Sequence, residues 1–542
     1  WRKGYPKAQR DQIRTLAARA ARNHVTFAWA VAPGQTLCFS SKKDIDDLDA
    51  RIEEMWRLGG RAFQLQFHDV SYEEWHCDAD RDSFGTGPAA AARAQAEVAN
   101  EIARRLRERH PGAAPLSILP TEFYQSGATR YRSALARELD SGIEVAWSGV
   151  GVVPATISGT ELGSTAEVFG HRLITMDNYP VNDSSENRVH LGPYTGRDPA
   201  VANASAGVLA NAMRQPVASR IALFTVADFA WNPRGYDPDA SWRAALADLA
   251  GGDGKAREAL SVLAGNSSSS PLEKKESAYL QPLLRDFWTA FEAEEPSALP
   301  AAAGRLKAAF EAMAAAPDRL AGVENGALAR ELRPWLDQLA RFGRAGRAAV
   351  EMLSAQRRGD GDRAWAAQLA VQRAMRELAG REASVGDGVL GPFLDRALAA
   401  ADSWTGARPD ERTATSTMGA ARDFDPSLML DGKPSTYYWT DVPPQPGDAF
   451  GVRLGAERQI REIRVEMGGT GPAADDYLRD AVLEYLSPDG KGWHRVGTYR
   501  DRQTITARLP EGTVAREVRL RATKPGTTKV AVRSFTVTTA DQ

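Results

Sequence analysis

Residues 1–250 alternate between two hydrophobic periods, and this alternation limits the chain to a small group of folds. Helical patterns such as 44–58 and 89–110 separate runs that have the character of buried strands. Strands that alternate with helices form a parallel sheet that the helices flank or close. The sequence therefore predicts an α/β domain. Six segments have the strand pattern, namely 25–32, 62–70, 116–123, 144–153, 173–178 and 220–228.

Polar or turn-forming residues follow most of the predicted strands, for example His68-Asp69 and Asp177-Asn178. In a (β/α)8 barrel, the loops at the carboxyl ends of the strands build the active site. Asp69 ends the second predicted strand and is the first candidate for a catalytic carboxylate. Six strands are too few for this barrel, and a partial sheet exposes long edges, which natural proteins avoid. We therefore expect an N-terminal segment outside this chain, either in a longer protein or on a separate chain.

Two regions of different composition follow the predicted barrel. Residues 273–401 are rich in Ala, Leu, Arg and Glu, and stretches such as 325–339 have the spacing of amphipathic helices. Short alternating runs separated by turns come next and are typical of a β-sandwich. The expected domains are a barrel over 1–252, a helical bundle or connector over 253–408 and a β-sandwich over 409–542. The runs that predict sandwich strands are 449–454, 462–467, 481–485, 504–508, 517–522 and 530–538.

Net charge and cysteine content exclude several classes of partner and site. A net charge of −2 gives no support for a nucleic-acid partner or an anionic membrane surface. No apolar run reaches the roughly 18 residues that a membrane span needs. Two cysteines, Cys38 and Cys77, are too few for a disulfide scaffold or a cysteine zinc site.

The two cysteines leave two interpretations open. Cys38 and Cys77 are either unrelated thiols or one disulfide between neighbouring loops. We favour the disulfide slightly, because both residues follow consecutive predicted strands on the same side of the sheet. A disulfide implies an oxidising compartment, and we therefore expect a secreted, extracellular protein.

Five motifs occur in order along the first 250 residues and combine polar residues with turn breakers. The first contains His68 and Asp69, and the fourth contains Asn178 and Asp183. The motifs are Phe-Gln-Leu-Gln-Phe-His-Asp-Val at 63–70, Pro-Thr-Glu-Phe at 120–123, Trp-Ser-Gly at 147–149, Met-Asp-Asn-Tyr-Pro-Val-Asn-Asp at 176–183 with Leu-Gly-Pro-Tyr-Thr-Gly-Arg at 191–197, and Gly-Val-Leu-Ala-Asn at 207–211.

By these motifs the chain resembles glycoside hydrolase family 84, the family of bacterial O-GlcNAcases and hyaluronidase-like β-N-acetylglucosaminidases. The resemblance implies a retaining hydrolase that removes terminal β-linked N-acetylglucosamine from a carbohydrate or glycoconjugate. It implies substrate-assisted catalysis without a cofactor, in which the carbonyl oxygen of the 2-acetamido group is the nucleophile. It also implies that the six strands are strands 3 to 8 of a (β/α)8-type barrel. The last domain resembles a discoidin-like carbohydrate-binding module.

The resemblance assigns roles to individual residues. Asp69 matches the general acid/base, which protonates the leaving oxygen and later takes a proton from water. His68 occupies the position of an aspartate that orients the acetamide. Asn178, Asp183 and Asn211 match residues that hold the sugar. The expected substrate site further includes Phe123, Met176, Ser148 and Tyr179.

Three positions depart from the family pattern. His68 replaces a carboxylate, Phe123 replaces a tyrosine that helps to hold the acetamide oxygen, and Met176 replaces an aromatic wall residue. A neutral imidazole can accept one hydrogen bond from an acetamide, but it supplies no negative charge to a developing oxazolinium. Two alternatives therefore stay open: a hydrolase with altered sugar specificity, or a weak or inactive relative that binds carbohydrate.

One loop of the predicted sandwich resembles the early loop of discoidin-type modules. It has the sequence Asp-Gly-Lys-Pro-Ser-Thr at residues 431–436. The resemblance implies a structural calcium held by carbonyl and carboxylate oxygens near Asp431, Ser435 and Thr436.

Overall fold

The computed structural model describes residues 1–378, 383–405, 412–433, 435–487 and 492–539. The chain forms two compact units, Trp1–Ala397 and Leu398–Gln542. The first unit contains a parallel sheet with its helices, followed by a helical region, and the second contains antiparallel strands. The predicted multidomain α/β fold class is confirmed.

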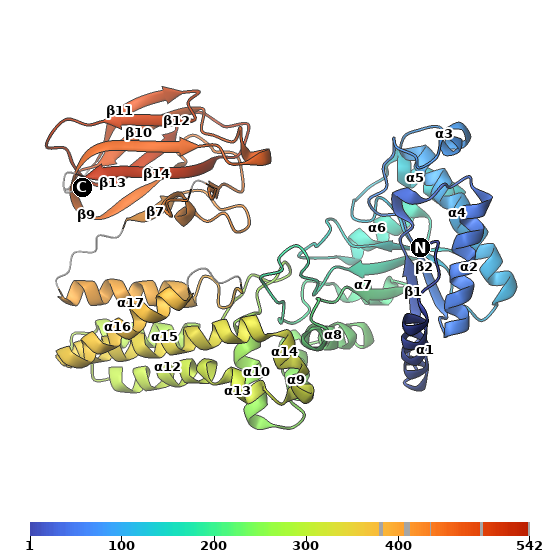
Figure 1. Cartoon of the computed structure of the whole chain (residues 1–542), viewed down its shortest axis with the longest axis horizontal. Coiled ribbons are helices and arrows are strands. Elements are labelled where there is room, and N and C mark those ends of the chain that lie inside the picture. Colours follow the sequence, from blue (N-terminus) through green and yellow to red (C-terminus); the bar gives the residue numbers. More distant parts are fainter. Residues whose placement is uncertain (379–382, 406–411, 434, 488–491, 540–542) are drawn as a thin grey trace. The chain divides into compact units, whose positions relative to one another are not determined.

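Six parallel strands form the sheet of the first unit, and each pairs with the next one along the chain. The intervening helices pack beside the sheet, and most contact the next helix along the chain (Figure 1). This is the arrangement of a partial (β/α) barrel, in which all carboxyl ends of the strands meet at one edge. The elements are α1 (Lys7–Arg22), β1 (Ala28–Val31), η1 (Gly34–Thr36), α2 (Lys42–Leu58), β2 (Ala62–Gln66), α3 (Asp78–Phe84), α4 (Pro88–Arg109), β3 (Ser117–Leu119), α5 (Arg130–Glu138), β4 (Glu144–Trp147), α6 (Gly159–Phe169), β5 (Leu173–Asp177), α7 (Pro199–Ala204), β6 (Gly207–Ala210), α8 (Pro216–Trp231) and α9 (Pro238–Ala250).

Side chains of the strands and of the apolar helix faces form one hydrophobic core beneath the strand ends. Leu65 of β2 and Val145 of β4 are fully buried in it, as are Leu48 of α2 and Val98 of α4. A one-residue slip would turn every buried side chain of a strand to the opposite face. The core therefore fixes the register of the sheet, and with it the positions of the loops that leave the strands.

The last predicted strand of the sheet is wrong. Residues 220–228 belong to helix α8, and β6 is the strand that pairs with β5. A short apolar run fits a buried strand or a buried helix equally well. Pro216 stands in the first turn, where a helix tolerates proline, and Asp228 lies on the helix instead of at a strand end. The buried residues recur at helical spacing, at Ala218, Ser219, Ile221, Ala222, Thr225, Val226 and Phe229.

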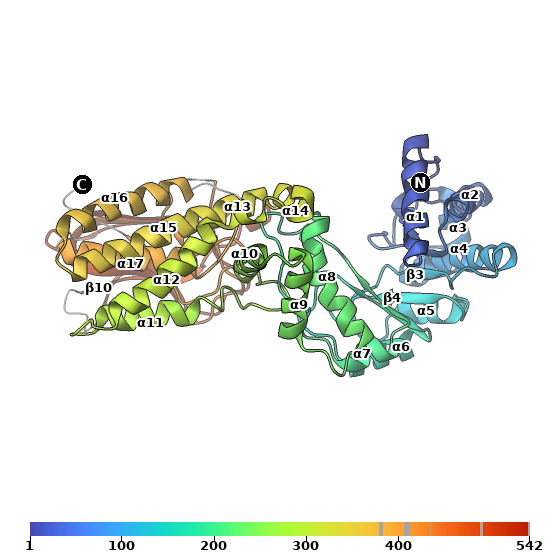
Figure 2. The ribbon, with the colours of Figure 1, turned by 90° about the horizontal axis from the view of Figure 1, so that it is seen from below.

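The helical region packs its long helices side by side (Figure 2). The helix predicted over 325–339 begins later than expected, because Glu324 and Asn325 have left-handed φ values of 50° and 55°. Two helices with a junction at Leu332 follow instead. The elements are α10 (Gly254–Gly265), α11 (Gln281–Glu292), α12 (Leu299–Ala314), α13 (Ala316–Leu320), η2 (Val323–Gly326), α14 (Ala327–Glu331), α15 (Arg333–Arg357), α16 (Gly361–Leu378) and α17 (Leu390–Thr405).

One long strand, β9 (Ala449–Met467), organises the antiparallel strands of the second unit. Its first part pairs with β7 and β13, and its second part pairs with β12 and β14. The predicted runs 449–454 and 462–467 are therefore two parts of one strand. The other elements are β7 (Thr413–Ser416), η3 (Pro426–Met429), β8 (Tyr438–Trp439), η4 (Gly471–Ala473), β10 (Asp480–Leu486), β11 (Trp493–Arg500), β12 (Thr504–Arg508), β13 (Val514–Ala522) and β14 (Ala531–Thr539).

Candidate active site

Asp69 lies in the turn that directly follows β2, with a backbone φ of 58°. Residues other than glycine rarely adopt this left-handed conformation, and such strain is concentrated at functional sites. Asp69 is exposed, and within the described part of the chain no group donates a hydrogen bond to its carboxylate or pairs with it. The carboxylate is therefore available to a ligand at the edge where the strand ends meet.

His68 lies between Asp69 and the buried core and is only partly exposed. Its Nδ1 atom is buried and has no hydrogen-bond partner among the described residues. The imidazole packs edge-to-face against Phe123, with ring centroids 6.4 Å apart. A buried polar atom without a partner costs free energy. The Nδ1 atom of His68 is therefore a group that a ligand beside the candidate acid could satisfy.

Hydrogen bonds link the loops after the neighbouring strands. The backbone N–H of Ser148, after β4, donates to the carbonyl of Phe123, after β3, at 2.8 Å. The side-chain amide of Asn178 donates to the carbonyl of Val152 at 2.8 Å. The amide of Asn211, after β6, donates to Asn178 Oδ1 at 3.2 Å. The structure thus brings Asn178 and Asn211 together and joins the loops after β3 to β6 into one surface.

A buried ion pair fixes the end of β5, next to Asn178. Arg197 donates through Nε and Nη2 to the two carboxylate oxygens of Asp177, each at 2.8 Å, and neither side chain is exposed. Burial, and then the charge of Asp177, raises the pKa of Tyr194 well above its usual value. The protonated hydroxyl donates to Asp177. All three residues belong to the fourth motif, and the motif alone did not predict this role. The signal for it is an acid in the first half of the motif and an arginine in the second.

Asp183 is exposed on the loop that follows β5, and none of the described residues pairs with its carboxylate. The loop is held by Asn182, whose side-chain amide donates to the carbonyl of Arg188 at 2.8 Å and to Gln215 Oε1 at 3.1 Å. Asp183 therefore presents an open carboxylate from a fixed loop, as a group that binds sugar hydroxyls requires.

Two residues of the expected substrate site point into the protein. Tyr179 is 1% exposed, and its hydroxyl donates to the carbonyl of Gly192 at 2.7 Å. Ser148 is fully buried, and its hydroxyl donates to the carbonyl of Gly151 at 3.0 Å. Both hydroxyls donate hydrogen bonds inside the fold, so these side chains hold the loops, and their contact with a substrate stays a prediction.

Phe123 and Met176 are half-buried and pack on a small cluster around Ala146. Strand β3 ends before Phe123, so Phe123 and Tyr124 lie in a loop instead of on opposite faces of a strand. Their rings are in edge-to-face contact, with centroids 5.1 Å apart. Tyr124 therefore places a hydroxyl beside the Phe123 ring, on the same loop.

Cys38 and Cys77 form a disulfide between the loops that follow β1 and β2. Asp80 lies beside it, fully buried, and accepts hydrogen bonds from the backbone N–H groups of Phe39 at 2.8 Å and Ser40 at 2.7 Å. Within the described residues, these two cysteines and Asp80 are the one group of ligand atoms close enough to hold a metal ion. Since the sulfur atoms are bonded to each other, the cluster is a structural link.

The loop expected to hold calcium is closed by its own hydrogen bonds. The Thr436 hydroxyl lies 2.9 and 2.8 Å from the two oxygens of Asp431, and the backbone N–H of Lys433 donates to Asp431 Oδ1 at 2.9 Å. Ser435 is exposed. These oxygen atoms suit calcium chemically, but an ion would have to displace the Thr436 hydroxyl, so the calcium stays a prediction.

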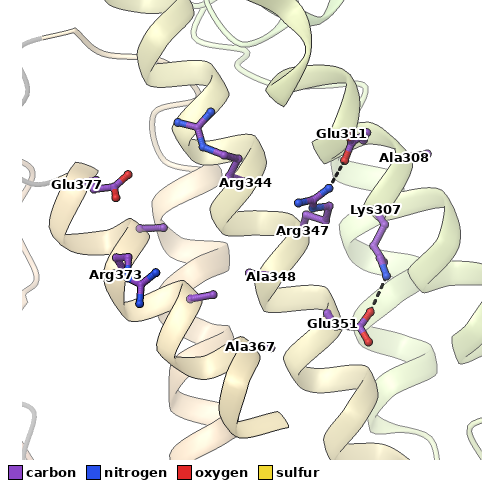
Figure 3. Close-up of a pocket in the computed structure, with 12 residues that line it drawn as sticks. Lys307, Ala308, Glu311, Arg344, Arg347, Ala348, Glu351, Ala367, Arg373 and Glu377 are labelled. Atoms are coloured by element: carbon purple, nitrogen blue, oxygen red, sulfur yellow. Dashed lines mark hydrogen bonds and ion pairs between the residues drawn. The ribbon is translucent and has the colours of Figure 1, made fainter. Parts of the chain in front are cut away.

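A cavity of about 750 Å³ in the helical region is lined by residues of α12, α15 and α16 (Figure 3). Four of its charged side chains form two pairs: Lys307 binds Glu351 at 2.6 Å, and Arg347 binds Glu311 at 2.8 Å. Among the described helices, none is long and apolar enough to cross a membrane.

Three family models match consecutive parts of the chain. Residues 1–265 match a family described as beta-N-acetylglucosaminidase, and residues 279–394 match one described as hyaluronidase post-catalytic domain-like. Residues 411–535 match the F5/8 type C domain. The order of the three matches follows the order of the barrel, the helical region and the antiparallel strands.

Similar proteins include the protein O-GlcNAcases of Rattus norvegicus and Mus musculus. They are 30% and 29% identical over 235 residues, which is 42% of this chain and 24% of each relative. The chain thus spans about a quarter of the length of these relatives.

Solved structures with the same fold include CpGH84B and a mutant of the O-GlcNAc hydrolase of Thermobaculum terrenum. The first has a TM-score of 0.62 and 26% identity, covering 73% of this chain and 68% of that one. The second has a TM-score of 0.65 and 25% identity, covering 75% of this chain and 85% of that one. Taken together with the motifs at the strand ends, these matches show that the chain belongs to glycoside hydrolase family 84.

Proposed function

We propose that this protein is a retaining glycoside hydrolase that removes terminal β-linked N-acetylglucosamine, or a closely related sugar, from a glycoconjugate. The observation that carries the proposal is the placement of Asp69. Its carboxylate is exposed at the end of β2, on a strained turn, and none of the described residues pairs with it. A general acid/base must reach the substrate directly, and none of the described charged groups occupies this one.

In the proposed reaction, Asp69 gives its proton to the glycosidic oxygen as the bond from that oxygen to carbon 1 breaks. The carbonyl oxygen of the 2-acetamido group bonds to carbon 1 and forms an oxazolinium ion, which keeps the acetamide N–H proton. Asp69 then takes a proton from the water that opens the oxazolinium ring at carbon 1, and the sugar leaves with its configuration retained. Asn178, Asp183 and Asn211 hold the sugar hydroxyls during both steps.

His68 has the role of orienting the acetamide in this proposal. A neutral imidazole has one nitrogen that accepts a hydrogen bond, and the acetamide N–H is a donor. Phe123, which packs against this ring, gives an apolar wall without a hydroxyl. Because His68 brings no negative charge to the developing oxazolinium, we expect slower acetamide-assisted hydrolysis than a carboxylate at this position would give.

The same two residues favour a second candidate, a hydrolase with a preference for a different group at carbon 2. The family resemblance assigns His68 and Phe123 to positions that face this group, and both depart from the family pattern, whereas the residues assigned to the sugar hydroxyls are kept. A third candidate is a weak or inactive relative that binds carbohydrate. The three candidates differ in which variant restores or removes activity.

The test is hydrolysis of 4-nitrophenyl β-glycosides by the wild type, Asp69→Asn and His68→Asp. The matched control is Asp78→Asn, an exposed aspartate at the start of α3. Activity on the N-acetylglucosaminide that Asp69→Asn lowers by about 100-fold or more, with an unchanged control, supports the proposal. Equal activity of Asp69→Asn and wild type would overturn it.

Other outcomes select the alternative candidates. An inactive wild type with an active His68→Asp identifies the binding relative. A wild type that cleaves another glycoside in preference to the N-acetylglucosaminide identifies altered specificity.

We also propose that the protein is secreted from a bacterial cell. The disulfide between Cys38 and Cys77 supports this location, since disulfides persist in oxidising compartments. Cell fractionation with antibodies against the protein tests it, and recovery from the cytosol with free thiols would contradict it.

A further inference from the structure

The substrate loop, defined as residues 181–190, carries Asp183 and is closed by hydrogen bonds of Asn182. The side-chain amide of Asn182 donates to the carbonyl of Arg188 at 2.8 Å, and its carbonyl oxygen accepts the backbone N–H of Arg214 at 3.3 Å. A loop closed in this way tends to move as one body. A contact elsewhere on the substrate loop therefore sets the position of Asp183.

The helical region makes such contacts with the substrate loop. The carbonyl of Asn187 accepts the indole N–H of Trp335, on α15, at 2.8 Å and the backbone N–H of Ser384 at 2.9 Å. The next residue, Arg188, forms an ion pair with Asp387. Trp335 is only 5% exposed, so its hydrogen bond is shielded from water. The substrate loop is thus attached to a helix far along the chain.

The end of α14, close to Trp335 in the chain, contacts helix α8, which follows Asn211. Helix α8 has no side-chain cap of its own, and its first N–H groups need an acceptor. The carboxylate of Glu331, at the end of α14, accepts the N–H groups of Val217 at 2.9 Å and Ala218 at 3.1 Å. A carboxylate at a helix N-terminus also interacts favourably with the helix dipole. Glu331 therefore fixes the start of α8, and through it the loop that begins at Asn211.

We infer that Glu331 and Trp335 are positioning residues for the sugar-binding side of the active site. They stand four positions apart at the junction of α14 and α15, and they brace the two loops that carry Asp183 and Asn211. None of the described hydrogen bonds or ion pairs joins this junction to Asp69. The inference rests on the proposed function for the identity of the ligand, but the brace itself is a property of the fold.

Glu331 and Trp335 brace the sugar-binding loops, and none of their described hydrogen bonds involves Asp69, so their loss should affect substrate binding and not the chemical step. Loss of a brace loosens groups that hold the sugar and leaves the acid/base in place. A change that affects substrate binding without the chemical step raises KM at constant kcat. We expect KM to rise by about 2- to 10-fold per variant, the factor that corresponds to one hydrogen bond.

The experiment uses the full chain with Trp335→Phe and Glu331→Ala, and two readouts. Hydrogen–deuterium exchange measures the substrate loop and the first turn of α8 without any substrate. Steady-state kinetics on the 4-nitrophenyl glycoside that the wild type cleaves fastest separates KM from kcat. Glu331→Gln, which keeps an acceptor oxygen, should restore part of the wild-type behaviour.

Two matched controls come from the same helical region. Trp288→Phe changes a buried tryptophan of α11 whose described contacts are with its own region. Glu311→Ala removes the acid that pairs with Arg347 beside the cavity of Figure 3. Neither side chain has a described hydrogen bond to the barrel, so both controls should leave the substrate loop unchanged.

Faster exchange confined to the braced segments, with higher KM and constant kcat, supports the inference. Wild-type exchange in Trp335→Phe and Glu331→Ala would overturn it, as would faster exchange spread over the whole unit or a fall in kcat at constant KM. If the wild type cleaves no glycoside, the proposed function fails by itself, and exchange alone decides whether the brace exists.

Discussion

The carboxylate of Asp177 and the guanidinium of Arg197 form a two-point ion pair in which neither side chain is exposed to solvent. The pair stands directly before Asn178, whose amide belongs to the candidate site. Arg197 also donates to the carbonyls of Pro154 at 3.1 Å and Ala155 at 2.8 Å, in the loop after β4. One buried pair thus holds two of the loops that surround the candidate site.

Removal of one member of this pair should destabilise the first unit strongly. Asp177→Ala leaves the buried charge of Arg197 without a partner, and we expect a loss of roughly 3–5 kcal/mol in the free energy of unfolding. The double variant Asp177→Ala, Arg197→Met should lose less than Asp177→Ala alone. Denaturation in urea measures both. Equal stability of Asp177→Ala and wild type would show that the pair has no structural role.

The disulfide should stabilise the loops after β1 and β2. Cys38 and Cys77 are 39 positions apart, and closing a loop of this length typically stabilises a protein by about 2–4 kcal/mol. Reduction should therefore lower the melting temperature of the wild type. The double variant Cys38→Ser, Cys77→Ser should melt lower than the oxidised wild type and show no response to reductant. A wild type that melts at the same temperature with and without reductant would contradict this.

Stability should fall on mild acidification. Burial lowers the pKa of His171 and of His190 below the ordinary 6.5, so the unfolded chain takes up protons before the folded chain does. The stability that comes from the two neutral rings is complete above about pH 6.5 and is lost as the pH falls through the lower folded pKa values. Urea denaturation at a series of pH values between 7.5 and 5 should show the decline.

The histidines can be separated from other acid effects by substitution. His171→Gln and His190→Gln should each flatten this part of the stability profile, whereas the control His76→Gln, at an exposed position, should not. A profile that keeps its slope in both buried-site variants would assign the decline to other groups.

Calcium in the second unit gives a further test. The Asp431 carboxylate is bound by the Thr436 hydroxyl within its loop, and an ion would have to replace this contact. If calcium binds, millimolar calcium should raise the melting temperature of the wild type, and Asp431→Asn should abolish the rise. A melting temperature that is the same in calcium and in chelator would show that the loop is closed by its own hydrogen bonds alone.

The sequence predicted a strand correctly where its hydrophobic pattern and the residues at its ends give the same bounds. Strand β5 is read correctly because its apolar run ends sharply at Asp177, and β12 because it alternates strictly from Thr504 to Arg508. The run at 220–228 was misread because a short apolar stretch does not reveal its period. The signals that decide it, Pro216 and the helical spacing of the buried residues, lie partly outside that run.

The candidate site was predictable to the extent that it depends on strand ends. His68 and Asp69 follow β2, and Asn178 follows β5, so their positions come from local pattern. The direction in which a side chain points does not follow from the local pattern. Tyr179 fits the motif but uses its hydroxyl on Gly192, a contact that only the folded loop creates.

No local sequence pattern predicts the contacts between the helical region and the substrate loop. Trp335 and Asn187 are separated by 148 positions, and nothing in their neighbourhoods in the sequence links them. Contacts of this kind arise from the packing of distant elements, which a single sequence does not show.

The role of Asp69 as general acid is tested most directly by the effect of the leaving group. Loss of a general acid slows poor leaving groups, which need full protonation, far more than good ones such as 4-nitrophenol, which need less. The measurement is kcat/KM of wild type and Asp69→Asn for aryl β-glycosides of increasing leaving-group pKa. The expected result is a steep fall with leaving-group pKa in Asp69→Asn and a shallow one in the wild type. Parallel dependences in the two proteins would contradict the assignment of Asp69.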